Sequence, residues 1–222
     1  MDESRVLVMG GHGKVALLAL PLLVEAGHEV TAVLRNPEHA ADVAETGAKP
    51  LVADVEQLGV EELATLFAGH DAIVWSAGAG GGSPSRTYAV DRDAAIRSMD
   101  AAARAGVRRY VMVSYFGSQI DHGVPTESSF FPYAEAKAAA DAHLATTDLD
   151  WTVLAPSRLL DEPPTGRIET ASQGATAGSV SRADVAAVVV HVLAEPATIG
   201  RTIRFNTGAT PIPDALTESD LA

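Results

Sequence analysis

The stretch RVLVMGGHGKVALLAL, residues 5–20, joins two apolar runs through the cluster Gly10-Gly11-His12-Gly13. The first run predicts a buried strand and the second a helix, so the glycines occupy a strand-to-helix turn. Such a turn is either a tight structural connection or a loop whose backbone N–H groups hold a phosphate. The small residue Ala16 follows at the spacing of a dinucleotide-binding turn, which favours the phosphate interpretation.

The rest of the chain alternates apolar runs with helical patterns. Strands are predicted at residues 5–10, 29–35, 49–54, 71–78, 108–117, 150–156 and 201–207. Strands that are apolar throughout and alternate with helices are typical of a parallel sheet covered on both faces. We therefore predict an α/β fold: a Rossmann-type, doubly wound, mostly parallel sheet with helices on both faces, in a single domain over residues 1–222.

Two segments, residues 117–131 and 157–180, interrupt this alternation. Both follow the carboxyl end of a predicted strand, where open α/β sheets bind their ligands. We expect residues 157–180 and the C-terminal part to form a small lobe on the substrate side. Because little chain remains once the sheet is built, a small substrate such as an aldehyde, ketone or quinone fits better than a nucleotide-sugar.

The composition argues against several functional classes. The chain has 29 Asp and Glu against 16 Lys and Arg, a net charge of −13, which makes nucleic acid and anionic membranes poor partners. It has no Cys, so disulfides, thiol nucleophiles and thiolate zinc sites are excluded. The seven His show no zinc-ligand spacing, and no metal is expected. We expect a cytoplasmic protein, because neither a signal-peptide pattern nor an apolar run of about 20 residues is present.

A cation after the second predicted strand bears on the identity of the nucleotide. About 20 residues beyond the turn, an acidic side chain would bind the ribose 2′-hydroxyl of NAD. The sequence here is Leu34-Arg35-Asn36. The planar fork of Arg35 suits a 2′-phosphate, which favours NADP over NAD; the alternative is a solvated surface arginine. His12 and Lys14 lie in or beside the turn and could add to the same pocket.

The segment FFPYAEAKAAADAHL places Tyr133 and Lys137 four residues apart, on one face of a predicted helix. A nearby ammonium would lower the pKa of the phenol and prepare it for acid–base work at neutral pH. The same ammonium can donate to a ribose hydroxyl, and Ser114 at a strand end would hold a substrate carbonyl. The alternative is an exposed residue pair and an unrelated strand-end serine.

Several motifs, in this order and spacing, resemble the atypical branch of the short-chain dehydrogenase/reductase superfamily. These small NAD(P)-binding, epimerase-like proteins are related to the NmrA-like group, and the resemblance covers nearly the whole chain. The motifs are GGHGKVA, LRNP, ADV, WSAGAG, GVRRYVMVS, YAEAK, LDWTVLAPSRL, SRADVAAVVV and GRTIRF. The resemblance implies that Ser114, Tyr133 and Lys137 form the catalytic set, with Tyr133 as general acid/base.

The resemblance also implies a set of cofactor contacts. The turn would hold the pyrophosphate, Arg35 the 2′-phosphate, and the segments after later strands the adenine, ribose and nicotinamide. The implied residues are Gly10, Gly11, His12, Gly13, Lys14, Val15, Arg35, Asp54, Val55, Ala77, Gly78, Lys137, Pro156 and Ser157. Two departures stand out: Ala16 replaces the last glycine of the turn, and Ala155-Pro156-Ser157 replaces a common Arg-Pro-Gly.

Some acidic residues have a structural interpretation. Ser181 and Asp184 precede the apolar run at residues 185–190 and are predicted to cap a late helix. Asp91 and Asp93 are interpreted in the same way, as cap residues before a helix that begins near Ala94.

Together these features predict an NADP-dependent oxidoreductase or epimerase-like enzyme. Hydride would move between the nicotinamide and a small carbonyl or sugar-like substrate, while Tyr133 handles the proton. The alternative is a non-catalytic NAD(P)H sensor of the NmrA-like type that reports to a protein partner. The glycine turn is expected under both, whereas Tyr133 and Lys137 favour the enzyme. Either could be a monomer or a homodimer.

Overall fold

The computed structural model of this chain describes residues 3–81 and 83–217. Its strands are β1 (Arg5–Met9), β2 (Glu29–Leu34), β3 (Lys49–Val52), β4 (Ala72–Trp75), β5 (Arg109–Val113), β6 (Asp150–Pro156), β7 (Arg158–Leu160), β8 (Arg167–Thr170), β9 (Ser179–Ser181), β10 (Arg201–Thr207) and β11 (Thr210–Pro211). Its α-helices are α1 (Lys14–Glu25), α2 (Ala40–Glu45), α3 (Val60–Phe67), α4 (Pro84–Thr87), α5 (Ala95–Ala105), α6 (Phe131–Leu144), α7 (Arg182–Ala194) and α8 (Ile212–Thr217). Short helical turns occupy η1 (Pro37–His39), η3 (Ala171–Gln173) and η4 (Pro196–Thr198), and η2 (Tyr88–Ala94) is π-helical.

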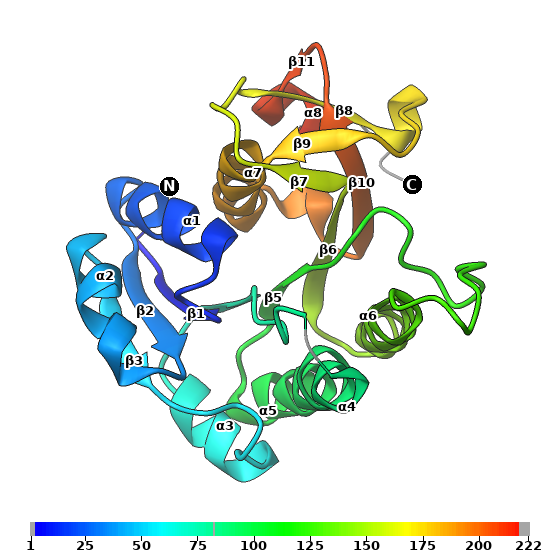
Figure 1. Ribbon diagram of the computed structural model, residues 1–222. Coiled ribbons are helices and arrows are strands. Elements are labelled where there is room, and N and C mark those ends of the chain that lie inside the picture. The colour runs from blue at the N-terminus through cyan, green and yellow to red at the C-terminus, as the bar shows by residue number, and fades with distance from the viewer. Residues whose placement is uncertain (1–2, 82, 218–222) are drawn as a thin grey trace.

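Nine strands form the central sheet, in the order β11-β8-β10-β6-β5-β4-β1-β2-β3 (Figure 1). The pairs from β3 through β10 are parallel, and only β8 and β11 add antiparallel pairs at one edge. The series β3-β2-β1-β4-β5-β6 is the strand order of doubly wound dinucleotide-binding sheets. The predicted fold class is therefore confirmed. The order reverses direction between β1 and β4, and such a switch point opens a crevice at the carboxyl ends of the strands.

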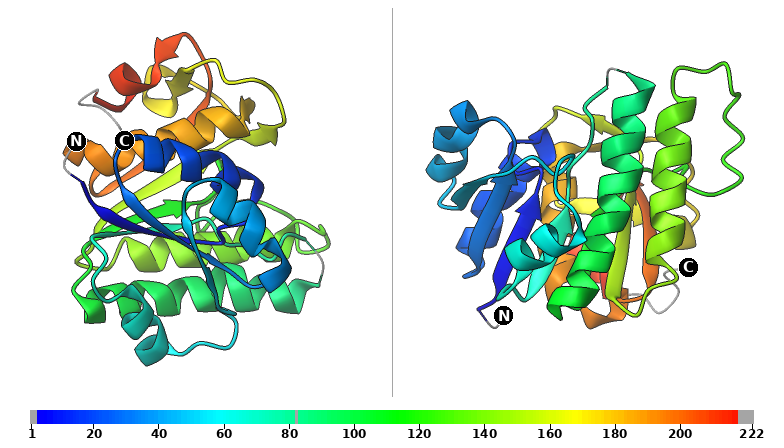
Figure 2. Two further views of the ribbon diagram at one scale, coloured as in Figure 1. Left: turned by 90° about the vertical axis from the view of Figure 1, so that its left-hand side faces the viewer. Right: turned by 90° about the horizontal axis from the view of Figure 1, so that it is seen from below.

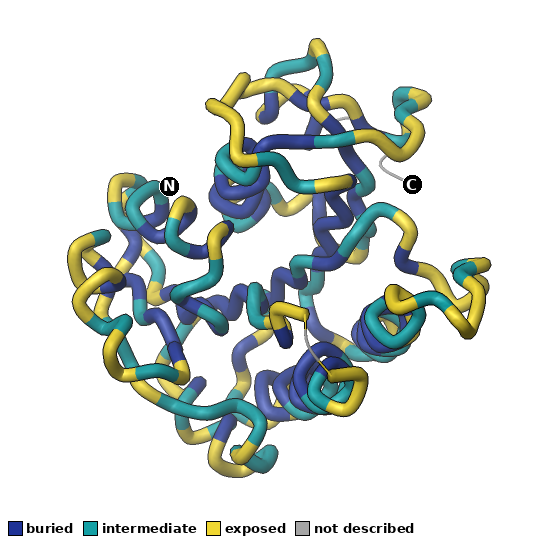
Figure 3. The backbone as a smooth tube through the Cα atoms, viewed as in Figure 1, coloured by how far each residue is buried: buried dark blue, intermediate teal, exposed yellow. Residues whose placement is uncertain are grey.

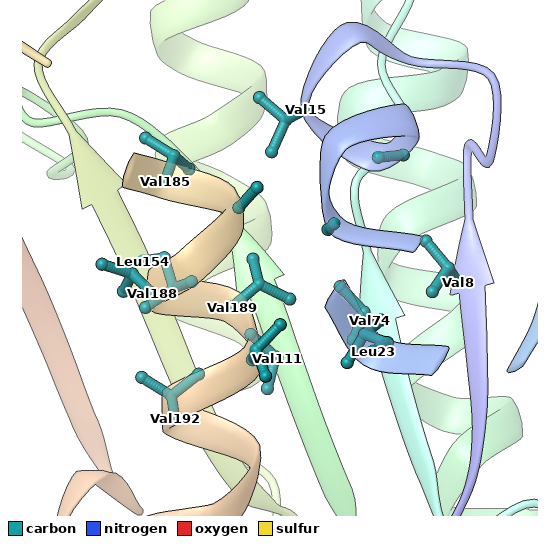
Figure 4. Close-up of a cluster of buried hydrophobic side chains, with 14 of the residues drawn as sticks. Val8, Val15, Leu23, Val74, Val111, Leu154, Val185, Val188, Val189 and Val192 are labelled. Carbon is teal, nitrogen blue, oxygen red and sulfur yellow. The ribbon is translucent and has the colours of Figure 1, made fainter. Parts of the chain in front are cut away.

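Helices cover both faces of this sheet (Figures 1 and 2). On one face, α1 and α7 pack together through an apolar cluster that includes Val15, Leu23 and Val189 (Figure 4). On the other face, α3, α5 and α6 bury a second cluster that contains Phe67 and Met99. The central strands are buried between the two layers, as runs of unbroken apolar residues require (Figure 3). Within the described residues, no helix combines the length and apolarity needed to cross a membrane.

The helix that ends at Gly106 begins earlier than predicted. Ser83 caps α4, accepting a hydrogen bond from Arg86 N (3.4 Å), and the π-helical η2 then links α4 to α5. Ser83 followed by Pro84 is a normal helix start signal. The prediction that Asp91 and Asp93 are cap residues is therefore wrong, because both lie well inside this helical segment.

The interrupting segment 157–180 forms β7, β8, η3 and β9. β7 and β9 make a separate two-stranded parallel sheet, whereas β8 joins the main sheet beside β10. At the end of β9, Ser181 caps α7 by accepting from Asp184 N (2.9 Å), which confirms the predicted cap. The single domain predicted over residues 1–222 includes residues 1–2, 82 and 218–222, which lie outside the described residues.

Candidate active site

The glycine turn is held tightly against its neighbouring strands. Gly10 N and Gly11 N both donate to Val33 O, at 3.0 and 2.8 Å. Gly10 has a φ of +82°, and a Cβ there would lie 2.6 Å from Ala77 Cα. A Cβ on Gly11 would lie 2.7 Å from Ala32 Cβ. Close packing therefore requires both glycines, and no larger residue would leave the turn in place.

The helix that follows this turn presents its positive end without a side-chain cap. Gly13 is the N-cap residue of α1, in extended conformation, and has no side chain to satisfy the N–H groups of the first turn. The macrodipole and these N–H groups favour an anion at this point. The geometry therefore fits a pyrophosphate on the turn.

A first cleft of about 340 Å³ lies beside the turn, between the carboxyl ends of β2, β3 and β4. Its walls combine the turn with segments that follow these three strands. Of the residues predicted to contact the cofactor, it is lined by Gly10, His12, Gly13, Arg35, Asp54, Val55, Ala77 and Gly78. More than half of the predicted cofactor residues therefore line one cleft.

Arg35 and Arg86 both line the first cleft and share one carboxylate. The Arg35 guanidinium donates to Glu56 Oε1 (3.2 Å), and Arg86 Nε donates to the same oxygen (3.0 Å). His12 and His39 stack with their ring centroids 3.7 Å apart. No role was predicted for Arg86, His39 or Glu56 from the sequence. Arg86 comes from α4, far along the chain, and only the tertiary fold brings it beside Arg35.

A second cleft of about 690 Å³ continues from the first. The two share Gly13 and the segment 76–79 as a common wall. The second cleft is lined by Lys14 and Val15 from α1, by Ser114 after β5, by Tyr133 and Lys137 from α6, and by Phe130 and Leu159 from the two interrupting segments. The glycine turn and the predicted catalytic residues therefore face one continuous space.

Tyr133 lies among aromatic side chains at the start of α6. Its ring centroid is 5.4 Å from that of Tyr115 and 5.3 Å from that of Phe130. Burial, followed by the negative charges of Asp91 and Asp141, raises the pKa of the Tyr133 phenol above its ordinary value. The phenol therefore carries its proton at neutral pH.

The pKa of Tyr133 is raised, whereas the prediction was that Lys137 would lower it. The Lys137 side chain is 1% exposed, and its Nζ donates to Val113 O (2.8 Å) and Met112 Sδ (3.4 Å). The ammonium is thus hydrogen-bonded to β5, and burial is the largest influence on the pKa of the phenol. Two of its three N–H donors are used in this way, which leaves one for a ligand in the second cleft.

Ser114 donates its hydroxyl hydrogen to Asp141 Oδ2 on α6. A serine has one hydrogen to donate, so Ser114 offers only acceptor lone pairs to the cleft in this arrangement. Holding a substrate carbonyl would require Ser114 to release Asp141 first, and that role stays a prediction. Asp141 was not identified from the sequence, although its position four residues after Lys137 places it on the same face of the helix.

Asp91 is a second acidic group that the sequence analysis did not assign to the site. It lines the second cleft from η2, is 2% exposed, and accepts a hydrogen bond from Ala79 N (2.9 Å). Burial raises the pKa of Asp91, although the positive charge of Lys137 opposes the rise. π-Helical turns are frequent at functional sites, and here the wide turn carries the carboxyl group to the shared wall.

Three predicted cofactor residues line neither cleft among the described residues: Gly11, Pro156 and Ser157. Gly11 lies behind the turn, against β2. Ser157 Oγ accepts from Gly178 N (3.0 Å), which ties the start of β7 to the segment before β9. Across the described part of the chain, no group of three or more His, Asp or Glu side chains is arranged to hold a metal ion.

Comparisons with known proteins agree with this geometry. The model of a family described as NAD(P)H-binding matches residues 10–196. The uncharacterized sugar epimerase YhfK of Bacillus subtilis is 34% identical over 214 residues, which are 96% of this chain and 98% of that protein. The matched family region contains the turn, α6 and the start of α7, so the likeness extends over both clefts.

Two solved structures are similar over almost the whole chain. A Bacillus halodurans protein, provisionally named an NAD-dependent epimerase/dehydratase, has a TM-score of 0.88 at 34% identity, covering 96% of this chain and 98% of that one. The oxidoreductase YlbE of Lactococcus lactis has a TM-score of 0.85 at 28% identity, covering 96% of this chain and 94% of that one. Both names denote nicotinamide-dependent or redox chemistry on this fold.

Proposed function

This chain belongs to the family of NAD(P)H-binding proteins, and from that premise we propose that it is an NADP-dependent oxidoreductase of small carbonyl compounds. The observation that carries the proposal is the continuous space from the uncapped end of α1 to the side chain of Tyr133. A dinucleotide would lie along this space, with its pyrophosphate at the turn and one nucleoside in each cleft.

The residues present fit this cofactor. Gly13 and the N–H groups of α1 would hold the pyrophosphate. Arg35 and Arg86 together outweigh Glu56 in charge, which favours the 2′-phosphate of NADP at the end of the first cleft. Lys137 has a donor left for the ribose in the second cleft. When bound, the cofactor supplies hydride transfer.

Tyr133 would act as the general acid in the reducing direction. Among the described residues its hydroxyl has no hydrogen-bond partner, and its side chain lines the second cleft. Its raised pKa keeps the proton on the phenol, ready for delivery to a carbonyl oxygen. Tyr115 and Phe130 pack against the ring and hold it in the cleft.

Cofactor binding is tested by titration with NADPH and with NADH, read by tryptophan fluorescence. Trp75 ends β4 and is fully buried directly before the shared wall at residues 76–79. We expect quenching by NADPH at lower concentrations than by NADH. Equal affinities would contradict the choice of NADP, and binding of neither nucleotide would contradict the proposed function as a whole.

Turnover is tested with NADPH and a panel of small aldehydes, ketones and quinones. We expect Tyr133→Phe to lower kcat by about 100-fold or more, with the Kd for NADPH unchanged. Tyr88→Phe is a matched control, because the Tyr88 hydroxyl donates to Glu135 on the surface. Turnover that survives Tyr133→Phe would remove Tyr133 from the mechanism. Tight NADPH binding without turnover on any substrate would favour the non-catalytic sensor.

A further inference from the structure

Two cations on the wall of the second cleft are held by a single carboxylate. Arg182 Nη1 donates to Asp161 Oδ1 (2.7 Å), and Lys14 Nζ donates to Asp161 Oδ2 (3.3 Å). Arg182 and Lys14 both line the cleft that contains Tyr133. Lys14 was predicted to contact the cofactor, and no role was predicted for Arg182 or Asp161.

The fold explains why these three residues meet. In the parallel pair of β7 and β9, Leu160 lies opposite Ser181, so Asp161 and Arg182 leave the same edge one residue later. Lys14 is the first residue of α1, and α1 packs against α7, which begins at Arg182 (Figure 1). Lys14, Asp161 and Arg182 are distant in the sequence but meet at the wall of the second cleft.

The charges of this cleft are unusual for so acidic a protein. The chain has a net charge of −13, yet the charged residues that line the second cleft in the described structure are Lys14, Asp91, Lys137 and Arg182. Asp91 and Lys137 are buried and bonded to the backbone. The two remaining groups are positive, and both face the same carboxylate.

Arg182 has donors to spare. Its side chain is only 21% exposed, while that of Asp161 is 67% exposed, so the guanidinium belongs to the wall and the carboxylate to the solvent side. A guanidinium has five N–H donors in a planar fork suited to a carboxylate. Exposed ion pairs are weak, and a carboxylate from a bound molecule can replace Asp161 at little cost.

We propose that Arg182, assisted by Lys14, binds a carboxylate group of the substrate, and that Asp161 occupies this position until the substrate replaces it. This inference rests on the proposed function and deepens it. The substrate class is then a small carbonyl compound with an apolar body and a carboxylate. Phe130, Pro132 and Leu159 line the same cleft and would contact the apolar body.

The competing role for Arg182 is a contact with the cofactor pyrophosphate. Arg182 lines the second cleft, which contains Tyr133, but not the first cleft among the described residues. The group that Arg182 holds in this structure is itself a carboxylate. Both facts favour the substrate, and the experiment below separates the two roles.

The kinetic test compares 4-formylbenzoate with its methyl ester, which has the same ring and aldehyde without the charge. With NADPH we expect the native protein to prefer the acid by about tenfold or more in kcat/KM, the effect of a charged hydrogen bond. Arg182→Gln should abolish this preference through KM, leaving turnover of the ester and the Kd for NADPH unchanged. Arg158→Gln is the matched control, because Arg158 is exposed on β7.

Asp161→Asn should change the KM for 4-formylbenzoate in the opposite direction to Arg182→Gln. Removing the internal carboxylate's charge should lower the KM for 4-formylbenzoate and leave that for the ester unchanged. An Arg182→Gln variant that loses NADPH affinity and keeps the preference for the acid would overturn the proposal in favour of the cofactor role.

A binding measurement keeps this inference separate from turnover. Calorimetry with benzoate on the NADP⁺-saturated protein should show binding in the native protein and in Tyr133→Phe, and none in Arg182→Gln. That pattern would support the carboxylate site even if no aldehyde is reduced and the proposed activity fails. Benzoate that does not bind the native protein, or that binds Arg182→Gln equally well, would overturn the site even in an active reductase.

Discussion

At the scale of single residues, hydrogen bonds decide what each polar group of the site can do. Ser114 donates to Asp141, so it faces the cleft as an acceptor. Lys137 is fastened to Val113 O and leaves the phenol of Tyr133 under the influence of burial. The spacing of Tyr133 and Lys137 indicated a shared helix face, but not these partners. The chemistry expected of Tyr133 is therefore acid catalysis rather than base catalysis at neutral pH.

Arg35 provides the first test at this scale. Arg35→Gln removes a charged donor from the end of the first cleft, where it pairs with Glu56 at 3.2 Å. We expect the Kd for NADPH to rise by about tenfold or more, since hydrogen bonds to charged groups contribute about 1.5–3 kcal/mol. The Kd for NADH should hardly change. A parallel loss for both nucleotides would mean that Arg35 does not contact the 2′-phosphate.

The pH dependence of reduction provides the second test. The reducing direction needs the protonated phenol, so the rate should be level through neutral pH and fall only where Tyr133 loses its proton. Asp91 is one of the charges that raise the pKa of Tyr133. Asp91→Asn keeps an acceptor for Ala79 N but removes that charge, so the alkaline fall should move to lower pH. Asp93→Asn is the control, and a shift to higher pH in Asp91→Asn would contradict this mechanism.

At the scale of elements, strand and helix ends place the functional groups. β6 and β10 lie at residues 150–156 and 201–207, as predicted: β6 is a mainly apolar run, whereas β10 alternates polar residues with the buried Ile203 and Phe205. The helical segment from Pro84 to Ala105 is longer than predicted, since its periodicity is interrupted by the π-helical η2. That irregular turn brings Asp91 into the cleft.

The start of α7 offers a test of stability at this scale. The Asp184 carboxylate is fully buried and accepts from Thr165 N, Gly166 N and the Ser181 hydroxyl. Asp184→Ala leaves these donors unsatisfied, and we expect a loss of about 3 kcal/mol in the free energy of unfolding. The melting temperature should fall by about 6–12 °C.

Ser181→Ala gives the matched comparison, because it removes the cap but keeps the buried carboxylate. Its expected cost is about 1 kcal/mol. Thermal unfolding followed by circular dichroism measures both variants. Equal effects of the two substitutions would show that Asp184 serves only the helix cap and does not fasten the segment at residues 165–166.

At the scale of the whole molecule, strand order creates the site. The switch between β1 and β4 places the glycine turn and segment 76–79 side by side, and both clefts share that wall. The sheet then continues to β5 and β6, which place Ser114 and β7 beside the second cleft. Cations from α1, α4, α6 and α7 collect around this crevice in a chain whose net charge is −13. The fold therefore concentrates positive charge where phosphates and carboxylates would bind.

Binding across this crevice should stabilise the whole fold. At a free NADPH concentration of about 100 times its Kd, mass action adds about 2.7 kcal/mol to the free energy of unfolding. For a chain of this size that corresponds to a rise of about 5–11 °C in melting temperature. NADH at the same concentration should give a smaller rise, and Arg182→Gln should keep the full response to NADPH. Identical rises with the two nucleotides would contradict the preference for NADP.

Much of the fold and part of the candidate site could be predicted from the sequence. The glycine turn, Arg35 and the Tyr133–Lys137 pair all depend on spacing within one element or on the order of neighbouring elements. Arg86, Asp91 and Asp141 were not identified, because their roles depend on contacts between elements distant in the chain. Ser157 was placed at the nicotinamide, and that role stays a prediction; in the structure its hydroxyl accepts a hydrogen bond from Gly178 N.

The sequence by itself determined the doubly wound sheet, since unbroken apolar strands alternating with helices have few other ways to bury their surfaces. It also indicated the glycine turn, because three glycines between a predicted strand and a predicted helix are typical of a dinucleotide-binding loop. Only the tertiary structure showed that burial raises the pKa of Tyr133, that Ser114 pairs with Asp141 and that Arg182 pairs with Asp161. Burial and electrostatic interaction depend on distances in space, and residue spacing along the chain does not contain those distances.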